Sequence, residues 1–243
     1  HVFYTTRKGY VSGAADLADT VKGCFLGQAG DWCTTPAQSI NYASCHDNMT
    51  LLDRISRSTP CVSEEDRIRM NNLSAVIYMT AQGIPFLQAG EEMLRTKIDA
   101  SGGFVENSYN SPDYVNSIKW DTLEDEAYQN VYNYYKGLIA FRKAHAALRL
   151  TNATDVNANI TSVDGLDENV LAFRINGGVN GETSDGIFVI FNPNSTETSV
   201  TLPDGAWDVC VNADHAGTEA LTTVSGSVSV EPISAMVLVK KES

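Results

Sequence analysis

The sequence predicts an α/β region followed by an all-β region. In residues 1–151, two short apolar runs of β-strand character flank a segment of helical periodicity, and this order of strand, helix and strand is typical of a parallel β/α unit. In residues 152–243, short β-type runs separated by turn signals replace the helical pattern, as in an antiparallel β-sandwich. We therefore expect two domains, 1–151 and 152–243, with the boundary near Thr151.

The composition is that of a folded, acidic protein. The 243 residues include 17 Lys and Arg against 30 Asp and Glu, for a formal net charge of −13, and 43% are hydrophobic. A negative charge of this size argues against a nucleic-acid backbone or an anionic membrane surface as partner. The longest apolar stretches, such as residues 75–79, are far shorter than the ~20 residues that cross a bilayer. We expect neither nucleic acid nor a membrane as a partner.

Cofactor motifs are missing from the sequence. The five cysteines form no Cys-x-x-Cys pair, and no P-loop, Gly-x-Ser-x-Gly or His-Glu-x-x-His motif occurs. We therefore expect no metal and no cofactor. The first residues lack an initiator Met and the order of segments found in a signal peptide, so we expect the chain to be cut from a longer one.

The first strand is expected at residues 39–45, where it delivers His46 and Asp47 at its C-terminal end. Ser63 is a helix N-cap followed by three acidic residues, which favour the first turn of a helix. Apolar residues then recur at helical spacing until Gly83. The sequence therefore predicts one amphipathic helix after the first strand.

The second strand is expected at residues 84–88 and ends at Glu91 and Glu92, which we interpret as ion-pair partners with a structural role. The segment 95–120 is unusually long and rich in Gly, Asn and aromatic residues, a composition suited to a binding loop. Residues 121–150 carry an apolar stripe at helical spacing and basic residues in the last turns, and are predicted to be helical.

Six β-type runs are predicted in the C-terminal region. Their residues are 170–175, 186–191, 198–202, 207–211, 228–230 and 235–239. Alternating strands bury one face each, and large aromatic side chains dominate the cores of such sandwiches. We expect a separately packed sandwich whose core includes Trp207, Phe173 and Phe188, with no core shared across Thr151.

His46 and Asp47 are the first candidates for chemistry. They lie at the C-terminal end of a strand, where the loops of a β/α fold converge. Strict alternation would point them to opposite faces, so both can line one site only if the strand turns or bulges there. A structural interpretation is equally open, with Asp47 capping the next segment and His46 a buried, hydrogen-bonded histidine.

Three motifs in order resemble the α-amylase clan, glycoside hydrolase family 13. Residues 41–53 contain a His-Asp-Asn-x-Thr-Leu-x-Asp form of the seventh-strand motif that is most similar to type I pullulanases. Residues 82–92 resemble the eighth strand, and residues 107–116 resemble a pullulanase substrate loop. The resemblance implies that residues 1–151 are the last β/α units of a (β/α)8 TIM barrel and that residues 152–243 are the β-sandwich domain that follows it.

The resemblance also assigns roles. Asp47 resembles the third family carboxylate, which binds sugar hydroxyls and helps to distort the ring, and His46 resembles the neighbour that binds the same sugar. Asn107 and Asn110 match loop positions that contact glucose hydroxyls, although turn formation explains each of them as well. Arg95 could reach the same cleft, unless it is simply a solvated surface residue. We expect Asp47 to face an open cleft beside His46, with Asn107 and Asn110 along the rim.

A complete enzyme of this type would hydrolyse α-1,6-glucosidic bonds in pullulan, amylopectin or limit dextrins with retention, which needs a nucleophile and an acid about 5–5.5 Å apart. In the family these come from the fourth and fifth barrel strands, whose motifs are not in this sequence. We therefore expect this chain alone to be inactive, with an α-glucan and the N-terminal remainder of the barrel as its partners. Two alternatives stay open, namely another family 13 hydrolase of α-1,4 amylase or isoamylase type, and a non-catalytic α-glucan-binding fragment.

Overall fold

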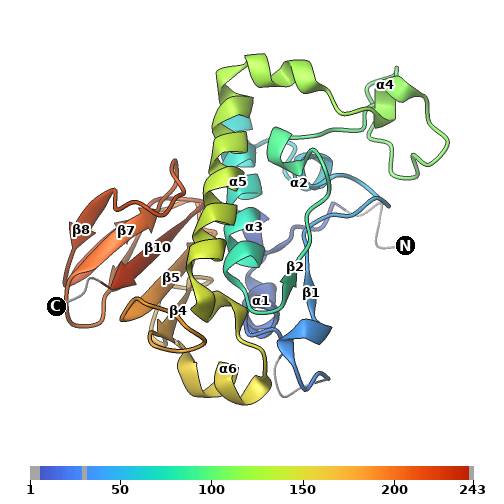
Figure 1. Ribbon diagram of the computed structural model, residues 1–243. Helices are drawn as coiled ribbons and strands as arrows, with labels where there is room; N and C mark the ends of the chain where they lie inside the picture. The colour runs from blue at the N-terminus through green and yellow to red at the C-terminus, as the bar shows by residue number, and fades with distance from the viewer. Residues whose placement is uncertain (1–5, 29–31, 241–243) are drawn as a thin grey trace.

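Two long helices stand at the centre of the molecule. The structure is a computed structural model that describes residues 6–28 and 32–240. In it α3 (Glu64–Thr80) packs beside α5 (Glu126–Ala144), with a pair of strands on one side and a β-rich layer on the other (Figure 1). The other helices are α1 (Ala18–Phe25), α2 (Leu51–Ser58), α4 (Asp113–Asn116) and α6 (Ala153–Asn159), and the 3-10 turns are Tyr10–Ser12, Ala15–Leu17, Pro36–Gln38, Glu91–Met93, Trp120–Glu124 and Ala146–Arg149.

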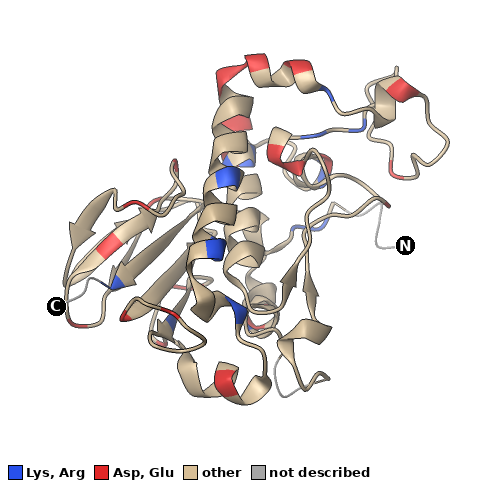
Figure 2. Cartoon of the chain, in the orientation of Figure 1, with Lys and Arg blue, Asp and Glu red and all other residues tan. Residues whose placement is uncertain are grey.

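Asp and Glu residues occur mainly on loops and at helix ends, and Lys and Arg residues are interspersed along the central helices (Figure 2). No helix in the described ranges is both long enough and apolar enough to span a bilayer.

The ends of α3 follow from its sequence. The Ser63 hydroxyl accepts a hydrogen bond from the Asp66 amide at 3.1 Å, and three acidic residues occupy the first turn, where they favour the positive end of the helix dipole. This confirms the predicted N-cap. At the other end, the buried guanidinium of Arg142 in α5 donates at 2.8 Å to the carbonyl oxygens of Met79, Ala81 and Gly83. The bonds to Met79 and Ala81 satisfy acceptors that the end of α3 leaves open.

The two predicted strands pair in parallel. β1 (Ile40–Asn41) lies beside β2 (Ile84–Pro85), with Ile40 opposite Ile84. The parallel pairing of the two strands is confirmed. Two helices, α2 and α3, lie between them where the sequence predicted one, and both strands are shorter than predicted. Gly83 makes the approach possible, because its φ is +100° and an added Cβ would lie 2.9 Å from the Ser39 carbonyl oxygen.

The predicted helix at 121–150 is divided into three parts. A 3-10 turn at Trp120–Glu124 precedes α5, and another at Ala146–Arg149 follows it. The Asp125 side chain caps α5 by accepting a hydrogen bond from the Ala127 amide at 2.8 Å. A side-chain cap inside the apolar stripe therefore starts the α-helix later than periodicity alone suggests.

Residues 152–240, here called the β-region, form two antiparallel sheets. The six-stranded sheet has the order β3-β4-β5-β10-β7-β8, and β6 pairs with β9 in a smaller sheet. The strands are β3 (Ile160–Ser162), β4 (Leu171–Asn176), β5 (Gly186–Asn192), β6 (Thr198–Thr201), β7 (Trp207–Val211), β8 (Thr222–Val224), β9 (Ser227–Val230) and β10 (Ser234–Lys240). All six predicted strands are present, and the sequence missed β3 and β8, which have three residues each and lie at the two edges.

One core of the β-region lies between its two sheets, as expected for a sandwich. Phe188 and Trp207 are buried in it with their ring centroids 5.9 Å apart, and Val200 of β6 and Val230 of β9 belong to the same cluster. The prediction that Phe188 and Trp207 contribute to the sandwich core is confirmed.

The other face of the six-stranded sheet packs against the helices. Phe173 lies in this second core, stacked on Phe25 of α1 at a centroid distance of 3.9 Å, and the cluster extends from Tyr10 to Val237. The expectation of a separately packed sandwich with no core shared across Thr151 is therefore wrong. A two-stranded sheet cannot cover both faces of a six-stranded one, so the helices cover the second face.

A buried carboxylate joins the two regions by polar contacts. Glu182 accepts hydrogen bonds from the Ala147 amide at 3.2 Å and from the Ser184 hydroxyl at 2.8 Å, and its Oε1 lies 3.1 Å from Nδ1 of His145. Burial on its own would raise the pKa of Glu182, but these partners lower it to about 2. The charged form of Glu182 is therefore the one that the fold holds.

Candidate functional site

His46 and Asp47 lie in the loop between β1 and α2, at the carboxyl end of the strand pair. Their side chains are 87% and 72% exposed, and His46 Nε2 is 3.5 Å from Asp47 Oδ2. β1 ends at Asn41, so the chain has already left the strand and alternation no longer separates the two side chains. His46 is not buried, and Thr50 rather than Asp47 caps α2. The structural interpretation of the pair is therefore wrong.

Asp47 lines a shallow cavity of about 220 Å³ together with Tyr42, Asn48 and Met49. Asn48 has a φ of +66°, a left-handed conformation that asparagine tolerates better than most residues. The chain bends at residues 46–48. The Asp47 carboxylate is exposed at the surface of this loop, where a ligand can reach it.

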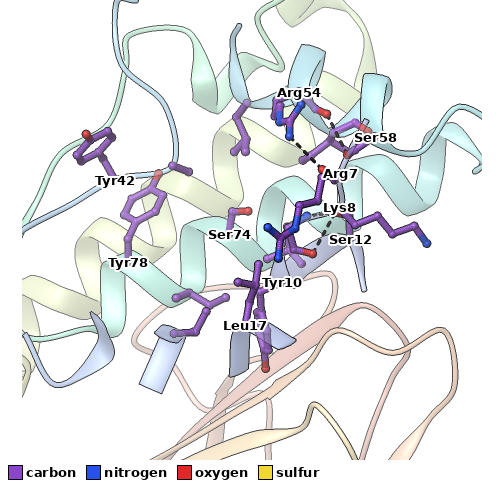
Figure 3. Close-up of a pocket in the computed structure, with 17 residues that line it drawn as sticks. Arg7, Lys8, Tyr10, Ser12, Leu17, Tyr42, Arg54, Ser58, Ser74 and Tyr78 are labelled. Atoms are coloured by element: carbon purple, nitrogen blue, oxygen red, sulfur yellow. Dashed lines mark hydrogen bonds between the residues drawn. The ribbon is translucent and has the colours of Figure 1, made fainter. Parts of the chain in front are cut away.

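A larger cavity of about 470 Å³ adjoins the first, since Tyr42 and Arg54 line both. Figure 3 shows it between the chain segment 7–12 and the helices α2 and α3. Arg54 Nη2 donates to the Arg7 carbonyl oxygen at 3.0 Å across one edge. The apolar residues that line this cavity include Val11, Leu17, Val21, Leu51, Ile55 and Ile77.

Lys97 contacts the backbone of the loop that carries His46 and Asp47. It is a residue that the sequence analysis missed. It is 2% exposed, and its ammonium donates to the carbonyl oxygens of His46 at 3.1 Å and Asn48 at 3.4 Å. Burial lowers the pKa of Lys97, as does nearby Arg95, while Asp53 and Asp47 oppose that shift. A lysine within a long polar segment carries no sequence signal for such a position.

Glu91, which follows β2, forms a hydrogen bond with Ser44, which follows β1. Its carboxylate accepts hydrogen bonds from Ser44 at 2.6 Å, Tyr78 at 2.6 Å and Tyr135 at 3.2 Å. Burial raises the pKa of Glu91, against the lowering effect of these hydroxyl donors. The interpretation of Glu91 as an ion-pair partner is wrong, since its partners are neutral hydroxyls. Glu92 likewise accepts a backbone hydrogen bond, from the Gly90 amide at 3.0 Å.

The second candidate group lies on the loop that contains α4. Asn107 and Asn110 are exposed, and Tyr109 between them is 83% exposed. Figure 1 shows this loop and the loop after β1 extending to the same side of the strand pair. Arg95 is half-buried, donates to the carbonyl oxygens of Ala89 and Asn116, and lines a separate cavity of about 50 Å³. The structure thus brings His46 and Asp47 together and keeps Arg95 in contacts of its own.

Comparisons with known proteins agree with one another. Residues 156–215 match the family model described as pullulanase, all-beta domain. Pullulanase of Bacillus subtilis (strain 168) is 34% identical over 181 residues, which are 72% of this chain and 24% of that protein. Isoamylase of Flavobacterium sp. is 29% identical over 216 residues, covering 72% of this chain and 27% of that protein.

Solved pullulanases match nearly the whole chain. The pullulanase from Bacillus acidopullulyticus has a TM-score of 0.92 at 37% identity over 99% of this chain and 29% of its own. The pullulanase from Paenibacillus barengoltzii, in complex with maltohexaose and α-cyclodextrin, has a TM-score of 0.88 at 36% identity over 100% of this chain and 37% of its own. The chain spans only about a quarter to a third of the length of these relatives. The chain is therefore similar to part of each of these pullulanases, and its residues 156–215 match the pullulanase all-beta domain.

Proposed function

We propose that this chain is part of a debranching glycosidase that hydrolyses α-1,6-glucosidic bonds in pullulan, amylopectin or limit dextrins with retention. The observation that carries this proposal is the exposed pair of His46 and Asp47 at the carboxyl end of a parallel strand, in a chain similar to pullulanases. The complex of a similar pullulanase with maltohexaose supports an α-glucan as the ligand.

The finer fold assignment is that residues 1–151 are the last β/α units of a (β/α)8 barrel and residues 152–243 the domain after it. Parallel pairing of β1 and β2, with α2 and α3 between them in sequence, supports this assignment. Further support comes from uncovered apolar side chains on the strand pair and directly after it, namely Ile40 (59% exposed), Tyr42 (55%), Ile84 (48%) and Phe86 (44%).

The remainder of the barrel is the proposed partner of this surface. Two strands leave sheet edges unpaired, and exposed apolar side chains that gather on them need a cover. The 470 Å³ cavity beside α2 and α3 supports the same partner, because it is lined largely by apolar side chains. Pairing with further strands would cover both features at once.

In the proposed mechanism Asp47 is a catalytic residue that contacts the sugar. A carboxylate accepts hydrogen bonds from two sugar hydroxyls, and these charge-assisted bonds stabilise a distorted ring best in the transition state. His46 donates to the same sugar. Asn107 and Asn110 are the proposed contacts from the α4 loop, and Arg95 holds that loop in place through the carbonyl oxygens of Ala89 and Asn116. The nucleophile and the general acid would come from the part of the barrel that this chain does not contain.

The test is Asp47→Asn in the complete protein. The amide is isosteric but uncharged, so the fold should persist while kcat/KM on pullulan falls by a factor of at least roughly 10². Asp204→Asn, at an exposed turn of the β-region, is the matched control and should leave the rate unchanged. Turnover of Asp47→Asn near that of the unmodified enzyme would exclude a catalytic role for Asp47.

A second candidate activity rests on the similarity to an isoamylase. Comparing initial rates on pullulan and on glycogen separates the two, since an enzyme of the pullulanase type should act on pullulan.

A further inference from the structure

The loop that carries Asp47 combines exposed side chains with a fixed backbone. His46 and Asp47 project into solvent, yet the carbonyl groups on either side of Asp47 both bind one buried ammonium. Lys97 Nζ donates to the His46 carbonyl oxygen at 3.1 Å and to the Asn48 carbonyl oxygen at 3.4 Å. Lys97 thus binds the backbone on both sides of Asp47, the residue whose carboxylate must point toward the sugar in the proposed chemistry.

Lys97 is itself held from several sides. Its amide donates to Oδ2 of Asp53 at 2.8 Å, and Asp53 is fully buried on α2. Its carbonyl oxygen accepts from the Val105 amide at 2.8 Å, and the neighbouring residue Ile98 forms a β-bridge with Phe104. The ammonium therefore extends from a backbone that is fixed on both sides. A fixed backbone limits the positions that the ammonium can take.

We propose that Lys97 is a positioning residue, whose ammonium fixes the direction of the Asp47 carboxylate through the carbonyl groups of His46 and Asn48. An ammonium has three donors and no acceptor, so when it is buried it must find oxygen atoms, and here two of them belong to this loop. The left-handed conformation of Asn48 persists where surrounding contacts determine it, and Lys97 supplies one such contact. The inference rests on the proposed function, because a fixed direction of the Asp47 carboxylate matters only if Asp47 contacts a sugar.

The test is Lys97→Met, which keeps most of the side-chain volume and removes the ammonium. In the complete protein kcat on pullulan should fall by on the order of 10²-fold, the cost of misplacing a reacting group by about 1 Å, with a smaller change in KM. Lys136→Met removes an exposed lysine on α5 and should change neither constant. Lys97→Arg keeps the charge but moves the donors, and serves as the test variant if Lys97→Met does not fold.

A double-mutant cycle with Asp47→Asn separates positioning from a general loss of structure. If Lys97 acts through Asp47, adding Lys97→Met to Asp47→Asn should cost little further activity. Full additivity of the two changes would overturn the inference, as would unchanged kcat for Lys97→Met.

Amide hydrogen exchange provides a readout without catalysis. In the 243-residue chain, exchange at residues 45–49 should become faster in Lys97→Met and stay unchanged in Lys136→Met. Unchanged exchange in Lys97→Met would overturn the inference even if the enzyme is active. Faster exchange, in a complete protein that fails to act on pullulan, would support the role of Lys97 in the loop and reject the proposed function.

Discussion

The six-stranded sheet and the parallel pair of β1 and β2 differ in how they are covered. β5 is buried at every position, because the helices lie on one face of its sheet and the strands β6 and β9 on the other. β1 and β2 instead leave four large apolar side chains between 44% and 59% exposed on and beside them. The β-region thus completes its packing with the helices, whereas the strand pair leaves apolar side chains uncovered. The residues proposed to contact sugar lie at the end of the incompletely covered sheet.

The largest expected effect concerns activity. The 243-residue chain by itself should release reducing ends from pullulan at less than roughly 10⁻³ of the rate of the complete protein, because binding groups without a nucleophile and an acid give little catalysis. Adding the N-terminal remainder should restore activity if it covers the strand pair. Activity before the addition would mean that this chain carries a pair of catalytic carboxylates that we have not identified.

The next effect contrasts an aromatic residue that packs against the six-stranded sheet with one that lies beside the strand pair. Phe25→Ala removes a fully buried ring that stacks on Phe173, and should lower the free energy of unfolding of the 243-residue chain by about 3–5 kcal/mol. Phe86→Ala removes a ring that is 44% exposed, and should cost less than about 1 kcal/mol there. Urea denaturation of both variants measures the difference.

The comparison of Phe86→Ala with Phe25→Ala should change in the complete protein, where the proposed remainder of the barrel would bury Phe86. The cost of Phe86→Ala should then rise, while that of Phe25→Ala stays the same. An equal cost for Phe86→Ala in the two proteins would show that the strand pair gains no cover.

The last effect, smaller than that of Phe25→Ala, concerns the buried carboxylate of Glu182 between the two regions. The pKa of Glu182 is about 2 in the fold against an ordinary 4.5, so its charged form stabilises the fold above pH 4.5, and that contribution is lost as pH falls toward 2. Glu182→Gln should lower the free energy of unfolding at pH 7 by about 1–3 kcal/mol.

Urea denaturation at several pH values tests this sign. The difference between Glu182→Gln and the unmodified chain should shrink between pH 4.5 and pH 2, whereas Glu197→Gln, at an exposed position, should show no difference at any pH. A difference for Glu182→Gln that persists at pH 2 would assign the effect to shape rather than charge.

Local signals in the sequence predict most of the elements but not their packing. Ser63 was identifiable as an N-cap because cap and first turn are adjacent in sequence, and the parallel strand pair followed from the order of elements. β3 and β8 were missed because three residues are too few to show alternation. Phe173 was assigned to the wrong core, because alternation separates two faces without saying which face meets the helices.

The candidate site divides in the same way. His46 and Asp47 could be identified because strand ends carry reactive groups in a β/α fold, and their exposure agrees with that expectation. The position of Lys97 and the partners of Glu91 could not be predicted, because the contacting residues lie far away in sequence. For Lys97 these contacts are backbone carbonyl groups, which any residue would supply. Support of this kind depends on tertiary structure.

The stack of Phe25 on Phe173 also has a consequence for synthesis. A ribosome adds roughly 5–20 residues per second and releases the N-terminal part first, so Phe25 emerges well before the strands that cover it. During that interval α1 presents an apolar ring with no partner, and contacts this distant in sequence form slowly. Aggregation or binding by a chaperone is therefore favoured while the helices have been made and the strands that cover Phe25 have not. Release of β4 and β5, which carry Phe173 and Phe191, is the step that gives this ring its aromatic partners.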